Sequence, residues 1–195
     1  MNNTRLTAIT GGIGVGKSVV AHILRVLGYD VYDTDSEARR IMTESDAVRA
    51  RLVDEFGKDI FRGNELRRDV LGAVVFGNAD KLATLNAIVH RAVIDDVERW
   101  RAAADAPRVF VETAILYSSG LVDSVDDVWC VTADDETRIA RVIRRSGLSR
   151  EAVVARIQAQ IAEAAAVGGP RRYMVVNDGR TPLLPRIHDL LCGEI

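Results

Sequence analysis

The residues best suited to chemistry form one run near the N-terminus, Gly11-Gly-Ile-Gly-Val-Gly-Lys-Ser18. Their types and spacing match the phosphate-binding loop G-x-x-x-x-G-K-[ST] in full. Glycines let successive backbone N–H groups turn inward around phosphate oxygens, which side chains would block. Lys17 would reach the β- and γ-phosphates of a nucleotide, and Ser18 would ligate Mg²⁺. The run therefore predicts a site for a nucleoside triphosphate, formed by Gly11, Gly12, Ile13, Gly14, Val15, Gly16, Lys17 and Ser18.

The context of this loop supports the prediction. Residues 6–10 read as a short buried strand before it, and a helix from Lys17 follows, so that the positive end of a helix dipole would face the phosphates. Lysine is rare, because only three of the 26 basic residues are lysines, namely Lys17, Lys58 and Lys81. A lysine at the position that the motif requires is therefore more informative than usual.

Two acids, Asp33 and Asp35, follow a second predicted strand at residues 30–32. The carboxyl ends of strands in a doubly wound sheet line one crevice, so these acids would face the phosphate-binding loop. A kinase needs a carboxylate to orient an attacking hydroxyl and accept its proton, and others to hold Mg²⁺ through water. A turn with Asp35 capping a helix from residue 36 explains the same residues. Spacing alone leaves both interpretations open.

Arginines are concentrated between residues 138 and 156. This segment contains six arginines and one acid, so its local charge is +5. Arg138, Arg141 and Arg145 share one helix face at i, i+3 and i+7. Phosphoryl transfer needs cations around the moving group, so the segment at about 138–160 is a candidate lid. A solvated basic helix face is the alternative.

Hydrophobic patterning places these residues on an α/β frame. Further strands are predicted at 108–111, 127–131 and 173–176, and helices at about 134–146, 150–165 and 182–192. Short apolar strands separated by helices predict a parallel sheet that is covered on both faces. Residues 36–103 read as mostly helical, most clearly at 80–101, and are too long for a simple crossover. We therefore expect an inserted helical subdomain.

Composition narrows the function further. The chain has 195 residues and a net charge of −2, so no global basic field favours nucleic acid. The sequence contains no run of about 18 apolar residues, so no membrane span is predicted, and no signal peptide is recognisable. Two cysteines are too few for a disulfide framework, which fits a reducing compartment. We expect a cytoplasmic protein that acts without membrane or nucleic acid.

Among proteins with such a loop, the sequence favours small-molecule kinases. The Asn-Lys-x-Asp guanine reader of nucleotide switches does not occur. The strand at 109–111 ends in a lone Glu112, a weak candidate for the acid of motor ATPases. A compact chain with an insertion and an arginine-rich segment fits a kinase better.

The sequence resembles the dephospho-CoA kinase family. The resemblance spans nearly the whole chain in order. It is carried by residues 10–18, by Asp33-Thr-Asp-Ser-Glu-Ala-Arg39, by residues 66–68, 75–76, 85–90 and 111–116, by Arg141 to Arg145, by Gln160 and by Asn177-Asp-Gly179. It implies a parallel-sheet P-loop NTPase fold, like that of nucleoside monophosphate kinases. The core would comprise about 1–35, 106–137 and 161–195, the acceptor-binding subdomain about 36–105, and the lid about 138–160.

The resemblance also implies an activity and a role for each matching residue. The family is a phosphotransferase that moves the γ-phosphate of ATP to the ribose 3′-hydroxyl of dephospho-CoA, the last step of coenzyme A synthesis. Asp35 matches the proposed catalytic base, helped by Asp33, with Lys17 and Arg141 beside the moving group. The loop through Val19, the lid residues Arg141 and Arg145, and Asn177 near the adenine would bind ATP with Mg²⁺ on Ser18. The residues expected on the acceptor side are Asp33, Asp35, Arg39, Arg68 and His90.

Three residues depart from the family pattern. Arg91 stands where members often have Pro, Ser118 where many have Glu, and Arg172 where many have Asp. These departures affect the contacts around 112–118 and 172, including any metal role for Glu112. Two other functions stay open, namely another small-molecule or nucleoside monophosphate kinase and a nucleotide-binding switch without phosphoryl transfer. We expect a monomer or a small homo-oligomer.

Overall fold

A computed structural model describes residues 4–160, 163 and 169–193. The described chain divides into two compact units. The first comprises the residues up to Tyr32 together with those from Ala104 onward, and the second comprises Asp33–Ala103.

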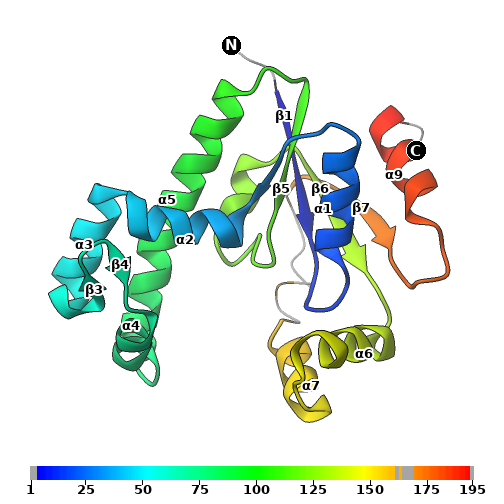
Figure 1. The fold of residues 1–195 in the computed structure, drawn as a ribbon. Coiled ribbons are helices and arrows are strands. Elements are labelled where there is room, and N and C mark those ends of the chain that lie inside the picture. Colours follow the sequence, from blue (N-terminus) through cyan, green and yellow to red (C-terminus); the bar gives the residue numbers. More distant parts are fainter. Residues whose placement is uncertain (1–3, 161–162, 164–168, 194–195) are drawn as a thin grey trace. The chain divides into compact units, whose positions relative to one another are not determined.

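The first unit is built on a five-stranded sheet in the order β2-β5-β1-β6-β7 (Figure 1). The strands are β1 (Arg5–Thr10), β2 (Val31–Asp33), β5 (Arg108–Glu112), β6 (Asp127–Thr132) and β7 (Arg171–Val176). The central strand β1 pairs in parallel with β5 and β6, and β6 pairs in parallel with β7, so that Thr7 lies opposite both Phe110 and Asp127. This order confirms the predicted α/β fold with a mostly parallel sheet.

Both faces of the central strands are buried, which is why their sequences are apolar without alternation. On one face α1 (Lys17–Val26) and α9 (Leu183–Cys192) lie side by side (Figure 1). Leu24 of α1 and Ile187 of α9 are fully buried there with Phe110 and Trp129 of the sheet. The rings of Phe110 and Trp129 meet edge to face with centroids 5.1 Å apart. This core fixes the ends of β1 and α1, between which the glycine run lies.

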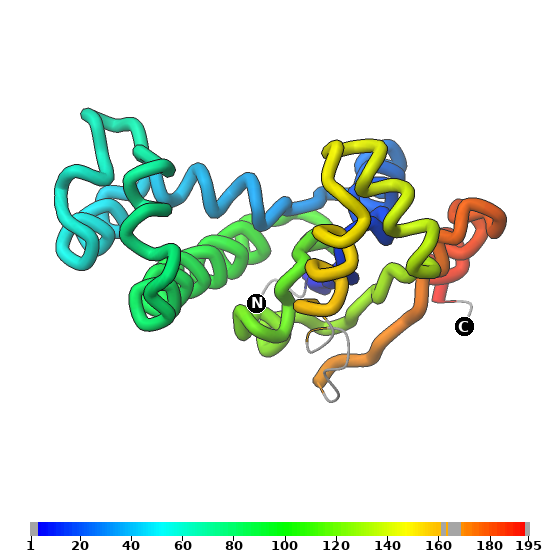
Figure 2. The backbone as a smooth tube through the Cα atoms, turned by 90° about the horizontal axis from the view of Figure 1, so that it is seen from below, coloured from blue at the N-terminus to red at the C-terminus, as the bar shows by residue number. Residues whose placement is uncertain are grey.

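After β6 the chain forms two short helices, α6 (Asp135–Ser146) and α7 (Arg150–Ala159), which fold back on each other (Figure 2). They share a small core made of Ile139, Val142, Val153 and Ile157. Gly147 ends α6 in the left-handed conformation, with a φ of 67°, and Ser149 caps α7 by accepting the Ala152 N–H. Residues 147–149 between the two helices therefore form a tight turn. The predicted continuation of α7 to 165 lies largely outside the described residues.

The second unit consists of α2 (Thr34–Glu44), α3 (Asp46–Phe56), α4 (Arg68–Val75) and α5 (Ala79–Ala103). The long helix α5 packs against the other three. A small antiparallel hairpin, β3 (Phe61–Arg62) with β4 (Glu65–Leu66), was not predicted. Each of its strands has only two residues, too few for an alternating pattern, and Gly63 makes the turn with a φ of 60°. The predicted helix at 80–101 is confirmed as α5.

None of the helices in the described part of the chain combines the length and the apolar character that a membrane crossing requires.

Candidate active site

The glycine run forms the loop between β1 and α1, and its backbone is open to phosphate. Gly16 occupies the N-cap position of α1 with a φ of 92° and has no side chain to place over the first turn. The N–H groups of that turn therefore combine with the helix dipole to favour an anion. Ser18 and Val19 are exposed in the same turn, so that the Ser18 hydroxyl is accessible.

Gly11, Gly14 and Gly16 of the loop are required by their neighbours as well as by their backbone angles. A Cβ atom on Gly11 would lie 2.3 Å from the carbonyl oxygen of Val131, and Gly11 has a φ of 144°. A Cβ atom on Gly16 would lie 2.2 Å from Nδ2 of Asn177. The loop is therefore packed closely against the ends of β6 and β7, and larger residues would displace it.

Lys17 reaches back across this loop. Its Nζ atom donates to the carbonyl oxygen of Gly11 over 2.9 Å. The ammonium group therefore lies at the start of the loop, where an incoming phosphate would be a stronger partner for it than the neutral Gly11 carbonyl. This is the position expected of a lysine that binds the β- and γ-phosphates.

Arg138, which the sequence analysis noted only as part of the basic helix face, contacts the loop directly. Its Nε atom donates to the carbonyl oxygen of Ile13 over 3.0 Å, and its side chain is only 15% exposed. An ion pair of 2.9 Å with Asp135 orients the guanidinium group. From the end of α7, Oε1 of Gln160 accepts the N–H of Ile13 over 2.7 Å. The two helices predicted as a lid thus hold the loop at one residue.

Arg141 lies one turn further along α6 and also contacts the loop. It donates to the carbonyl oxygen of Asn177 over 2.9 Å and to that of Val15 over 3.5 Å. Asn177 is buried at the end of β7, and its Nδ2 atom donates to Val15 over 2.8 Å. Arg145 is exposed in the last turn of α6. The structure therefore brings Arg141 and Asn177 to the loop and leaves Arg145 at the surface.

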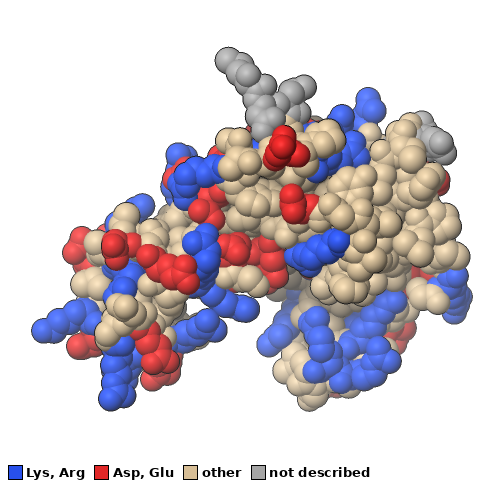
Figure 3. Space-filling view, turned by 45° about the horizontal axis from the view of Figure 1, so that its top comes forward, with Lys and Arg blue, Asp and Glu red and all other residues tan. Residues whose placement is uncertain are grey.

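Several exposed arginines surround these contacts. Arginine side chains gather over the lobe formed by α6 and α7, at the lower right of Figure 3. Among them Arg144, Arg145, Arg150 and Arg156 are exposed. Acids occupy the opposite end of α6, where Asp134 caps the helix, and hydrogen bonds from Thr137 hold the pKa of Asp134 below its usual range. The predicted concentration of positive charge is thus present beside the loop.

A pocket of about 210 Å³ adjoins the start of the loop. Gly11 and Gly12 form one wall, and Tyr117 and Arg172 lie on another. The Arg172 guanidinium lies over the Tyr117 ring, 5.4 Å from its centroid. Burial raises the pKa of Tyr117, whose hydroxyl is buried without a hydrogen-bond partner among the described residues.

The two sequence departures at 118 and 172 belong to the surroundings of this pocket. The carboxylate of Glu163 accepts the backbone N–H groups of Tyr117 and of Ser118, the latter over 3.0 Å. An acid from another part of the chain therefore lies beside residue 118. Sequence reasoning assigned no role to Tyr117 or Glu163, because their contact joins residues 46 positions apart.

The side chains that commonly bind metals do not cluster in the part of the chain that the structure describes. No three His, Cys, Asp or Glu side chains come together as a metal site in residues 4–160, 163 and 169–193. The acids at the start of β6 have structural partners, since Asp127 forms an ion pair with Arg5 and Asp126 accepts the N–H of Leu6 over 2.7 Å. An ion held by phosphate oxygens, water and one hydroxyl needs no such cluster, so Ser18 at the head of α1 fits Mg²⁺.

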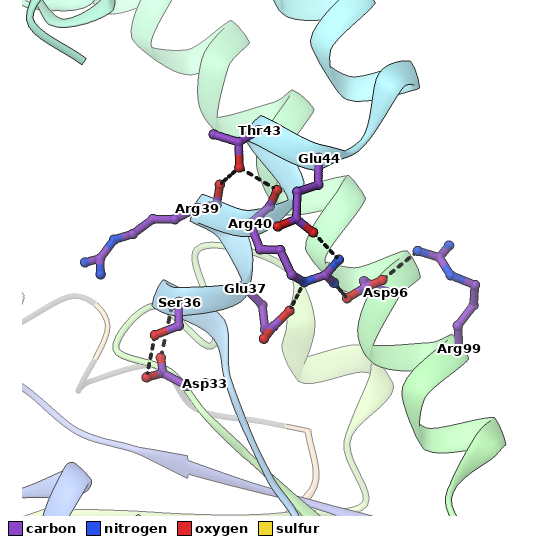
Figure 4. Close-up of polar contacts among 9 residues, drawn as sticks. All are labelled: Asp33, Ser36, Glu37, Arg39, Arg40, Thr43, Glu44, Asp96 and Arg99. Carbon is purple, nitrogen blue, oxygen red and sulfur yellow. Dashed lines mark hydrogen bonds and ion pairs between the residues drawn. The ribbon is translucent and has the colours of Figure 1, made fainter. Parts of the chain in front are cut away.

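In the second unit, α2 begins directly after Asp33. The Asp33 carboxylate accepts the N–H group of Asp35 over 3.0 Å. It also accepts the N–H group of Ser36 over 3.3 Å and the Ser36 hydroxyl over 3.0 Å (Figure 4). Asp33 is thus the helix cap, a role that the alternative interpretation wrongly gave to Asp35. Because Asp33 provides this cap, the carboxylate of Asp35 stays exposed in the first turn and is available for other partners.

Arg40 fastens α2 to α5. It pairs with Glu37 on its own helix and with Asp96 of α5 over 2.8 Å, and Arg99 also contacts Asp96 over 2.8 Å (Figure 4). Arg39, the predicted acceptor contact, points away from this cluster and is exposed. Of these two neighbouring arginines, Arg40 therefore holds α2 against α5, whereas Arg39 is exposed.

The other two residues predicted to contact the acceptor, Arg68 and His90, lie on different helices of the second unit, α4 and α5. Arg68 starts α4 and lines a pocket of about 520 Å³ together with Arg62, Arg67 and Thr43. His90 is half-buried in α5, and burial lowers its pKa, so that its ring is neutral at pH 7. A neutral His90 can donate or accept a hydrogen bond but offers no charge to an anionic acceptor.

The central parallel strand, the glycine loop with its lysine and the basic helices beside it define an α/β protein of the P-loop kinase class. The family model described as dephospho-CoA kinase matches residues 5–182. The chain therefore belongs to the dephospho-CoA kinase family.

Individual relatives agree with this assignment. The dephospho-CoA kinase of Bacteroides fragilis is 34% identical over 184 residues, which cover 94% of this chain and 89% of the relative. The crystal structure of TT1252 from Thermus thermophilus is 32% identical and has a TM-score of 0.80, with coverage of 99% of this chain and 98% of the other. The dephospho-CoA kinase from Campylobacter jejuni, at 22% identity and a TM-score of 0.69 over 97% and 98% of the two chains, shares the fold.

Proposed function

We propose that the chain phosphorylates the ribose 3′-hydroxyl of dephospho-CoA with ATP and so forms coenzyme A. The observation that carries the proposal is the loop in which Lys17 Nζ lies 2.9 Å from the Gly11 carbonyl, in a chain of this family. Such a loop binds the triphosphate, and the family supplies the acceptor. We place this reaction in the cytoplasm.

The proposed chemistry is a direct in-line transfer. The 3′-oxygen forms a bond to the γ-phosphorus while the bond from that phosphorus to the bridging oxygen of ADP breaks. The hydroxyl proton passes to the carboxylate of Asp35, which also aligns the oxygen for attack. Asp33 keeps Asp35 in the first turn of α2 by capping that helix.

Cations stabilise the charge that develops during the transfer. Lys17 exchanges the Gly11 carbonyl for the β- and γ-phosphates, and Arg141 and Arg145 contribute positive charge from α6. Mg²⁺, when bound, would neutralise charge on the β- and γ-phosphates, with Ser18 as its protein ligand. Water is excluded by α6 and α7, because ATP hydrolysis would otherwise compete with transfer.

The parts of the chain divide the work in this proposal. The first unit without α6 and α7 binds ATP, with Asn177 near the adenine. The helices at about 138–160 act as the lid. The helical subdomain at about 36–105 binds dephospho-CoA, with Arg39, Arg68 and His90 on the acceptor side.

A coupled assay of ADP release tests the acceptor. Dephospho-CoA is compared with a panel of nucleoside monophosphates at equal micromolar concentrations. We expect acceptor-dependent ADP release with dephospho-CoA alone. Release with a nucleoside monophosphate instead would assign the chain to another kinase, and ATP binding without stimulated release would indicate a switch.

A further inference from the structure

The peptide groups on the two sides of Ile13 are held from outside the loop. The Ile13 N–H donates to Oε1 of Gln160 over 2.7 Å, and its carbonyl oxygen accepts from Nε of Arg138 over 3.0 Å. The Ile13 side chain packs against the core shared by α6 and α7. One residue of the loop is therefore joined to both helices by two hydrogen bonds and an apolar contact.

The position of Ile13 in the loop gives this clamp a function. Lys17 Nζ lies at the carbonyl of Gly11, and the lysine of such loops binds the β- and γ-phosphates. The segment from Gly11 to Ile13 therefore lies at the end of the loop where the transferred phosphoryl group is held. A small shift of this segment would move the phosphorus relative to its attacking oxygen, and transfer rates fall steeply with such misplacement.

Glutamine is chemically suited to this position. An acceptor is required there, because a backbone N–H points at it, and Lys or Arg could not accept. A carboxylate would accept but would place a negative charge beside the triphosphate. Both side chains lie close to the loop, since a Cβ atom on Gly12 would lie 2.4 Å from the Arg138 guanidinium and 3.3 Å from Gln160 Oε1.

We propose that Gln160 is a positioning residue for phosphoryl transfer, which acts with Arg138 through the backbone of Ile13. The inference rests on the proposed kinase function and extends it. In this arrangement α6 and α7 are fixed at their roots to the loop, so that the geometry of the terminal phosphate is set by side chains that need not touch it.

The first test replaces Gln160 by Met, which has a similar length and is only a weak acceptor. The matched control is Gln158→Met, because Gln158 is exposed two residues earlier on α7. Four quantities are measured for both variants: kcat, the Kd of a fluorescent ATP analogue, the exchange rate of the Ile13 amide hydrogen and the melting temperature.

For Gln160→Met we expect kcat to fall about tenfold, as for the loss of one hydrogen bond to the backbone. The Kd of the analogue should change less than about twofold, because the amides after Ile13 still bind the phosphates. The Ile13 amide should exchange faster, while the melting temperature and every value of Gln158→Met stay near wild type. Unchanged kcat in Gln160→Met, or a loss of kcat matched by a fall in melting temperature, would overturn the proposal.

Two further variants separate positioning from simple packing. Gln160→Glu keeps the acceptor, so it should keep the Ile13 amide protected while weakening analogue binding through its charge. Arg138→Met and the double variant complete a cycle, in which the two losses of kcat should be less than multiplicative because both act on one residue. Fully multiplicative losses would contradict a shared action. A wild-type chain without acceptor-dependent ADP release would instead refute the proposed function.

Discussion

The Nδ2 atom of Asn177 lies 2.2 Å from the point where a Cβ atom on Gly16 would stand. Asn177 is buried and donates from the same nitrogen to the Val15 carbonyl over 2.8 Å. The end of β7 thus closes over the one residue that caps α1. A loop which must expose its N–H groups to phosphate is thereby held rigid by a side chain from the far end of the sequence.

Replacing Gly16 by Ala should therefore distort the loop. Its φ of 92° is unfavourable for Ala, and the new methyl group would collide with Asn177. We expect about 2–4 kcal/mol lower stability by urea unfolding and a large loss of affinity for a fluorescent ATP analogue. Gly28→Ala is the control, since Gly28 has a similar φ of 89° but open space around it. Equal losses in both variants would show that the contact with Asn177 is unimportant.

Replacing Lys17 by Ala should lower turnover steeply, because the loss of a cation at the transferred phosphate typically costs about 10²–10³-fold in rate. The charged hydrogen bond to Gly11 is lost as well, and such a bond contributes about 1.5–3 kcal/mol to stability. Steady-state ADP release and thermal unfolding measure the two effects. Lys81→Ala removes an exposed lysine from the second unit and should change neither. Retention of more than about half of the activity by Lys17→Ala would contradict the role of Lys17.

The frame of the molecule could be predicted because its signals are local. Five short apolar strands and a motif with fixed spacing define the sheet and the loop, and the structure confirms both. The hairpin at 61–66 could not be predicted, because two-residue strands carry no periodicity. Short irregular segments take their structure from the helices around them.

Contacts between distant segments were the other limit. The hydrogen bond of Gln160 with Ile13 joins residues 147 positions apart, and nothing in either local sequence announces it. Helical spacing grouped Arg138 with Arg145, yet Arg145 lies about 10 Å further along the axis of α6 at 1.5 Å per residue. The spacing of the arginines predicted which face of α6 carries them. It could not predict which part of that face contacts the glycine loop.

Replacing Arg141 by Ala should lower turnover more than affinity for ATP. Arg141 stabilises the loop through Asn177 and Val15, so we expect about 1–2 kcal/mol lower stability together with a loss of roughly 10–100-fold in kcat. The Kd of the ATP analogue should change only a few-fold. Arg144→Ala, on the exposed side of the same helix, is the control. Equal losses in kcat and in affinity would argue against a role of Arg141 in the transfer step.

The pKa of His90 gives a prediction about acid stability. Burial lowers this pKa in the folded chain, so the unfolded chain binds a proton more readily at mildly acidic pH. The contribution of neutral His90 is present above the unfolded value of about 6.5 and is lost as the pH falls from there toward the folded value. The free energy of unfolding should therefore decrease less between pH 7.5 and 5.5 in His90→Gln than in the wild type. The control is His22→Gln, an exposed change on α1, which should show the same decrease as the wild type. If the free energy of unfolding of His90→Gln decreased as much as that of the wild type, His90 would be excluded as the cause.

Asp35 is the residue on which the chemical step depends in the proposed mechanism. Asp33 takes the capping role in α2, so Asp35→Asn should leave the helix and the fold intact. An amide cannot accept the hydroxyl proton, and we expect kcat to fall by roughly 10²–10⁴-fold with dephospho-CoA while the ATP analogue binds as before. Asp46→Asn is the matched control, because Asp46 is an exposed acid in the first turn of α3. Near wild-type turnover of Asp35→Asn would remove this carboxylate from the reaction and leave Asp33 as the acid to test next.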